Sequence, residues 1–81
     1  MKLKVLGPGC ARCRELFERT QKAVSELGIE CELEKVEDIN QITSYGVLFT
    51  PALVIDEQLK FSGKLPSVEE LKSLIQEKVK E

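Results

Sequence analysis

Two cysteines, Cys10 and Cys13, stand three positions apart in the segment GPGCARC near the start of the chain. Cysteine reacts as its thiolate, and an ordinary thiol with a pKa of about 8.5 is only a few per cent ionised at neutral pH. A stretch with helical spacing follows, and the start of a helix favours an anion through its unpaired N–H groups and partial positive charge. The pair is therefore a candidate redox couple, with a metal site and simple packing as the alternatives.

The spacing makes the two thiols unequal. Cys10 falls at the N-cap region of the expected helix and Cys13 about one turn inside it, with both sulfurs on the same side. Cys10 should be exposed and activated, with Arg12 and Arg14 adding positive charge nearby, while Cys13 should be more buried. In such a pair Cys10 attacks a substrate disulfide, a mixed disulfide forms, and Cys13 displaces the reduced product.

Composition excludes several other chemistries. The chain of 81 residues is long enough for one domain and has a net charge of −2, with no basic stripe backed by aromatic residues. Nucleic-acid binding therefore has no electrostatic basis. The absence of histidine removes Cys–His nucleophile pairs, Cys₂His₂ zinc sites and CxxCH haem attachment.

The compartment in which the protein is expected also affects how its cysteines should be interpreted. Met1 leads straight into KLKVL, which is too short and too charged for a secretory segment, and no run approaches the roughly 18 apolar residues that span a bilayer. We therefore expect a cytoplasmic protein. Its three cysteines, an odd number in a reducing compartment, favour a catalytic or metal role over a structural disulfide framework.

The residues around the cysteines predict the elements that position them. Lys2–Leu6 alternates as a strand, 11–27 has helical apolar spacing that Gly28 can end, and 29–36 alternates as a half-buried edge strand. Asp38 can cap a short helix that Gly46 can end.

The second half of the chain completes the pattern. The apolar run 52–55 and a strand at 59–62 form a hairpin across a tight turn at 56–58, and Ser67 with Glu70 caps a last helix. The order β-α-β-α-β-β-α predicts one α/β domain over residues 1–81, with a four-stranded mixed sheet and helices on both faces.

The metal alternative for the cysteine pair is a soft-metal site, for copper or zinc. Zinc is usually bound by four ligands, and only Cys31 offers a third thiolate. Two thiolates, by contrast, suit a linear copper(I) ion. Copper-carrying ferredoxin-like domains also place a CxxC after a first strand, but they end on a strand and this chain ends on a helix. Cys31 alternates with Ile29 and Leu33, which predicts a buried small hydrophobe.

Thr50 and Pro51 precede the apolar run of the third strand. Proline cannot donate to a sheet, so Pro51 either simply starts this strand or forms a cis peptide bond with Thr50. The sequence alone leaves both possibilities open.

At this point the chain resembles the thioredoxin-like superfamily, and in particular its small redox-active disulfide proteins of glutaredoxin size. The resemblance rests on GPGCARC, on YGV before TPALVID, on the closing SVEE helix and on the order of elements, and it covers essentially the whole chain. It implies a compact thioredoxin-like fold and a thiol–disulfide oxidoreductase that needs no cofactor beyond its redox-active disulfide.

The resemblance also implies roles for individual residues. Cys10 would be the nucleophile, Cys13 the resolving thiol and Pro51 a cis-proline facing them, while the Thr50 backbone would pair with an extended substrate. Gly9 and Arg12 are further candidates for substrate binding. The implied partners are disulfide-containing client proteins and a thioredoxin-reductase-like or other thiol electron donor, with no nucleic acid and no membrane, and the chain is expected to be a monomer.

The chain departs from the family pattern in three places. Gly9 stands where thioredoxins have tryptophan, and Ala11-Arg12 stand where they have glycine-proline. The first strand also lacks the buried aspartate of thioredoxin, and Lys4 is a candidate there for assisting proton transfer. The aromatic residues Tyr45, Phe49 and Phe61 are expected in the core or at its rim rather than in recognition, with the surface beside the cysteine pair as an alternative place for Phe49.

Overall fold

The computed structural model describes residues 1–9 and 11–79. Its elements follow in the predicted order: β1 (Lys2–Leu6), α1 (Ala11–Leu27), β2 (Glu32–Val36), α2 (Ile39–Ser44), β3 (Ala52–Ile55), β4 (Gln58–Ser62) and α3 (Val68–Val79). The order β-α-β-α-β-β-α is the predicted one, so the α/β fold class is confirmed.

The four strands form one mixed sheet in the order β2-β1-β3-β4. Strand β1 pairs parallel with β2, as the helical crossover between them requires, and antiparallel with β3. Strands β3 and β4 are antiparallel and joined by a tight turn. Because β3 is central and covered on both faces, all four of its residues are buried, which accounts for the unbroken apolar run ALVI.

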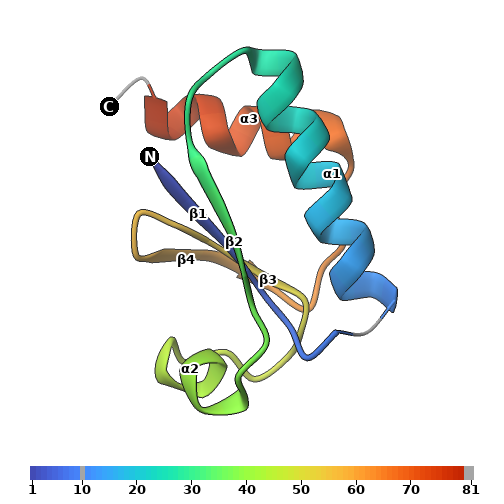
Figure 1. Cartoon of the computed structure of the whole chain (residues 1–81), viewed down its shortest axis with the longest axis vertical. Coiled ribbons are helices and arrows are strands. Elements are labelled where there is room, and N and C mark those ends of the chain that lie inside the picture. Colours follow the sequence, from blue (N-terminus) through green and yellow to red (C-terminus); the bar gives the residue numbers. More distant parts are fainter. Residues whose placement is uncertain (10, 80–81) are drawn as a thin grey trace.

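The helices divide unequally between the two faces of the sheet. Helices α1 and α3 lie together on one side, and α2 lies apart from them (Figure 1). The α1/α3 side packs Leu3, Val5, Leu16, Leu71 and Ile75, among others, all of them buried. The α2 side packs a smaller cluster that contains Leu6, Val36, Ile42 and Val54. Since α2 has only six residues, the start of β1 on that face carries lysines instead of apolar side chains.

Helix α1 has the predicted length and the predicted ending. Leu16, Thr20 and Ala23 are fully buried, and the Thr20 hydroxyl donates to the Leu16 carbonyl at 2.7 Å, which satisfies its polar atom inside the core. Gly28 has φ +66 and its N–H donates to the Val24 carbonyl at 3.1 Å. The left-handed glycine therefore ends the helix as expected.

Two strand boundaries differ from the sequence-based expectation. Strand β2 begins at Glu32 rather than at 29, because β1 begins at Lys2 and the register pairs Lys2 with Glu32. Strand β4 begins at Gln58, one residue early, because Asp56 and Glu57 alone form the turn, both with positive φ. Neither difference moves the cysteine segment.

Candidate active site

The site lies where β1 ends and α1 begins. Parallel pairing continues for one bond beyond the strands, since the Gly7 N–H donates to the Val36 carbonyl at 2.9 Å. The end of β2 is thereby held beside the segment that leads into the cysteine pair. Cys10 itself lies outside the described residues, so its predicted position at the start of α1 stays a prediction.

Cys13 is the described half of the cysteine pair. It is disulfide-bonded and only 5% exposed. Its side chain is packed against Gly7: a Cβ placed on Gly7 would overlap the Cys13 Sγ and lie 2.8 Å from the Cys13 Cβ. The same added atom would lie 3.8 Å from the Cβ of Thr50. Gly7 therefore leaves the space in which Cys13 and the Thr50 segment approach one another.

The Thr50–Pro51 peptide bond is cis, which decides between the two possibilities that the sequence left open. Pro51 is buried, and its carbonyl accepts from the Gly63 N–H at 2.8 Å, while Thr50 is half-buried. Just before them, Leu48 is 87% and Phe49 69% exposed. Phe49 therefore lies outside the core, on the surface, and a Cβ on Gly63 would stand 2.9 Å from its Cβ.

A small pocket of about 150 Å³ opens beside Cys13. It is lined by Val5, Gly7, Gly9, Cys13, Arg14, Lys35 and Glu37. The structure thus brings Gly9 to the site, whereas the candidate Arg12 is exposed and does not belong to this lining, where Arg14 stands instead.

Sequence reasoning missed Lys35 and Glu37. Lys35 pairs with Val5 across the parallel strands, and its Nζ lies 4.7 Å from the centre of the Phe17 ring. Glu37 follows the end of β2, and a Cβ on Gly9 would lie 3.0 Å from its Oε2. The available signal was the parallel crossover, because the carboxyl ends of parallel neighbours meet at one edge of the sheet.

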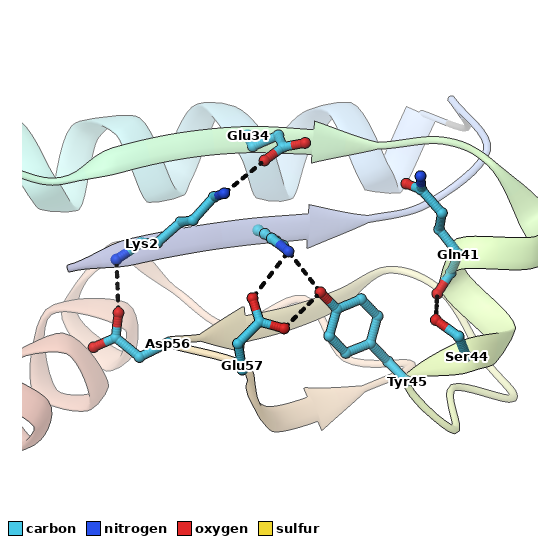
Figure 2. A network of polar contacts seen from close by, with 8 residues as sticks. Lys2, Glu34, Gln41, Ser44, Tyr45, Asp56 and Glu57 are labelled. Carbon is cyan, nitrogen blue, oxygen red and sulfur yellow. Dashed lines mark hydrogen bonds and ion pairs between the residues drawn. The ribbon is translucent and has the colours of Figure 1, made fainter.

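Lys4 lies on the other face of the sheet and does not line this pocket. Its Nζ donates to the Tyr45 hydroxyl at 2.6 Å and to Glu57 Oε1 at 3.0 Å. The Tyr45 hydroxyl in turn donates to Glu57 Oε2 at 3.0 Å; Figure 2 shows Tyr45 reaching from the end of α2 toward Glu57. These bonds raise the pKa of Lys4 and lower the pKa of Glu57. The Lys4 ammonium group is therefore engaged in hydrogen bonds to Tyr45 and Glu57, and nothing in its contacts supports a role in proton transfer to the cysteines.

Cys31 is a free thiol at the opposite end of the sheet. It is half-buried against the α1/α3 core, and burial raises its pKa. From Lys2, beside Cys31, to Gly7, beside Cys13, the chain runs along a strand for five steps, roughly 16 Å at the usual rise. Cys31 therefore cannot join Cys13 in one metal shell. Among residues 1–9 and 11–79, no three His, Cys, Asp or Glu side chains are grouped so as to hold a metal ion.

Comparison with known proteins places the chain in a family. The family model described as "Thioredoxin domain" matches residues 1–76. A protein named thioredoxin from Methanocaldococcus jannaschii is 44% identical over 70 residues, which cover 86% of this chain and 80% of that protein. Another protein named thioredoxin, from Methanothermobacter thermautotrophicus, is 40% identical over 75 residues, which cover 93% of this chain and 97% of the relative.

None of the helices in the described part of the chain is long and apolar enough to cross a membrane. The family match covers β1, the start of α1, the Thr50–Pro51 bond and most of α3. With both relatives aligned over most of the chain, the protein belongs to the thioredoxin domain family and is a thiol–disulfide oxidoreductase, a disulfide reductase of that family.

Proposed function

We propose that the protein reduces disulfides with Cys10 as the attacking thiol and Cys13 as the resolving thiol. The observation that carries this assignment is the state of Cys13, which is buried, disulfide-bonded and packed against Gly7 close to Thr50. A resolving thiol must be shielded from external disulfides yet lie next to the attacking sulfur, and the burial of Cys13 suits that task.

The reaction follows two exchanges. The Cys10 thiolate attacks one sulfur of the client disulfide, forms a mixed disulfide and releases the other client sulfur as a thiolate that takes up a proton. Cys13 then attacks the Cys10 sulfur, the bond between Cys10 and the client breaks, and the client leaves fully reduced. Two electrons pass from the protein to the client, and the disulfide between Cys10 and Cys13 remains for an electron donor to reduce.

Clients would dock on the segment before β3. The backbone of Thr50, next to Pro51, can pair with an extended peptide, and Leu48 and Phe49 offer exposed apolar side chains beside it. Gly9, which has no side chain and has φ +90, leaves room for the client near the sulfurs. Arg12 is exposed on the first turn of α1, where it can contact an approaching client.

The remaining assignments complete the proposal. The clients are disulfide-containing proteins, and the donor is a thioredoxin-reductase-like protein or another thiol. We expect residues 1–81 to act as a single-domain monomer in a reducing compartment such as the cytoplasm, without nucleic acid or membrane.

The direct test is a redox titration of the metal-free protein in glutathione buffers, quenched with acid and alkylated, with modified cysteines mapped by mass. Cys10 and Cys13 should interconvert as one two-electron couple between about −200 and −270 mV, while Cys31 remains a separate thiol. A pair that does not close under these conditions would contradict the proposal and favour soft-metal binding by the same two sulfurs.

Two variants separate the roles of the thiols. Cys10→Ser should abolish reduction of a protein disulfide, whereas Cys13→Ser should accumulate the mixed disulfide between Cys10 and the client. Cys31→Ser is the matched control and should reduce the same client at the rate of the unchanged protein. Full turnover by Cys13→Ser would replace the dithiol mechanism with one that uses Cys10 alone.

A further inference from the structure

The proposed reaction requires a proton to leave a buried place. Cys13 must lose its proton before it can attack the mixed disulfide, because the thiolate and not the thiol is the nucleophile. Its side chain is only 5% exposed, so bulk water does not reach the sulfur freely. The proton must therefore pass to a group that faces the space around Cys13.

The pocket beside Cys13 supplies that space. At about 150 Å³ it has room for several water molecules, since one water needs only about 10–15 Å³ of such volume. Three charged side chains line it: Arg14 from the first turns of α1, Lys35 from β2 and Glu37 just after β2. Arginine and lysine side chains carry hydrogen-bond donors and no acceptor, so neither suits the task of taking the proton.

We propose that Glu37 accepts the proton of Cys13, through pocket water, when the mixed disulfide is resolved. This inference rests on the proposed roles of Cys10 and Cys13. Among the described residues that line the pocket, Glu37 carries the one carboxylate. Its Oε2 lies close to Gly9, within 3.0 Å of where a Cβ on that glycine would stand, so the carboxylate faces the loop that leads into Cys10.

Backbone hydrogen bonding and the alternation of side chains along β2 position Glu37 beside the pocket. The bond from the Gly7 N–H to the Val36 carbonyl fixes the residue before Glu37 against the loop. Val36 points to the α2 side of the sheet, so the alternation along β2 sends Lys35 and Glu37 to the side of α1 and Cys13. The absence of a Gly9 side chain leaves room for the carboxylate.

The step balances without another reactant. Cys13 gives its proton to Glu37, and the resulting thiolate attacks the Cys10 sulfur. A bond forms between the two protein sulfurs, and the bond between Cys10 and the client breaks. Cys13 is oxidised, the client sulfur is reduced, and the departing client thiolate takes up the proton that Glu37 or the solvent returns.

The test compares Glu37→Gln with Glu34→Gln in a rapid-quench reduction of a peptide disulfide by the fully reduced protein. Glu34 lies on β2, three residues before Glu37 and on the other face of the sheet, where its Oε2 is 3.7 Å from the Lys2 Nζ. Its variant therefore makes the same charge change away from Cys13. Acid quenching and mass analysis follow the mixed disulfide and the released peptide from pH 5 to 9. Glu37→Gln should resolve the mixed disulfide at least about tenfold more slowly at neutral pH and recover as pH rises, while Glu34→Gln matches the unchanged protein.

The sign of the effect excludes a purely electrostatic role. Removing a negative charge beside Cys13 favours its thiolate, so charge alone would make Glu37→Gln resolve faster. Glu37→Asp, which keeps a carboxylate, should recover part of the lost rate and guards against a folding defect of the glutamine variant. Resolution by Glu37→Gln at or above the unchanged rate, or equal slowing in Glu34→Gln, would overturn the proposal for Glu37. Absence of any mixed disulfide with Cys13→Ser would instead overturn the proposed function and this inference with it.

Discussion

At the scale of single residues, Gly7 differs in kind from the other glycines. Gly9, Gly28, Gly46 and Gly63 all have positive φ, where a side chain strains the backbone. Gly7 is not among the positive-φ residues, and its requirement is space, because an added Cβ would overlap the Cys13 Sγ. Gly7 therefore serves the packing of the resolving sulfur rather than the shape of the turn.

Gly7→Ala should consequently change the redox chemistry as well as the stability. Overpacking at a buried contact costs about 1–3 kcal/mol. The disulfide fixes the Cys13 sulfur against residue 7, whereas a reduced thiol can rotate away, so the oxidised form should lose more stability than the reduced form. A difference of about 1.4 kcal/mol raises the reduction potential by about 30 mV. The measurement is the glutathione titration, combined with urea unfolding of both redox forms.

Gly28→Ala provides the matched control for that prediction. No atom lies within 4 Å of a Cβ added there, but its φ of +66 makes alanine cost about 1–2 kcal/mol. It should lower the stability of both redox forms equally and leave the potential unchanged. Equal shifts of the potential in the two variants, or none in Gly7→Ala, would show that the contact between Gly7 and Cys13 has no redox consequence.

At the scale of elements, α3 depends on its first turn for a defined start. The Ser67 hydroxyl accepts from the Glu70 N–H at 3.3 Å and lies 3.5 Å from the Glu70 carboxylate, as the sequence pattern predicted. The helix then buries Leu71 and Ile75 against α1. The cap thus sets where this apolar stripe begins.

Ser67→Ala should therefore lower the free energy of unfolding by about 1 kcal/mol, the usual cost of losing an N-cap. For a domain of this size that loss corresponds to a fall of roughly 4–8 °C in Tm. Calorimetry and urea unfolding of the oxidised protein measure it. Ser73→Ala is the control, since Ser73 is exposed within the same helix and alanine is the better helix former there. If Ser67→Ala proved as stable as Ser73→Ala, the cap would contribute nothing.

At this scale, some features of the fold could be predicted from the sequence and others could not. Helix α1 and its end at Gly28, the order of elements and the cap at Ser67 were predictable, because each depends on residues close together in the chain. The start of β2 was not, because it depends on where the distant β1 begins to pair. Glu37 was missed for the same reason: its place beside Cys13 comes from the register of two strands separated by a whole helix.

At the scale of the whole molecule, ion pairs among the described residues join segments from distant parts of the chain. Lys4 in β1 meets Glu57 in the turn between β3 and β4 at 3.0 Å, and Tyr45 joins them from the end of α2. Lys72 in α3 meets Glu26 in α1 at 2.6 Å. Each pair therefore spans elements that separate when the chain unfolds.

These pairs predict a loss of stability in acid. Hydrogen bonds from Lys4 and then Tyr45 lower the pKa of Glu57, and the hydrogen bond from Lys72 lowers that of Glu26. In the unfolded chain both return to about 4.3, so the unfolded state binds more protons just below that pH. Their contribution is complete above the unfolded value and disappears as pH falls through the lower folded values.

Urea unfolding between pH 7 and pH 3 tests this coupling. Glu57→Gln should be less stable than the unchanged protein at pH 7, and the difference should shrink as pH falls, because the unchanged protein loses the same charge by protonation. Glu18→Gln, at an exposed position on α1, should show no such convergence. Both pairs face solvent, so the difference should also be smaller in 1 M salt. A gap between Glu57→Gln and the unchanged protein that stayed constant down to pH 3 would mean that the Lys4–Tyr45–Glu57 contacts hold the strands by geometry rather than by charge.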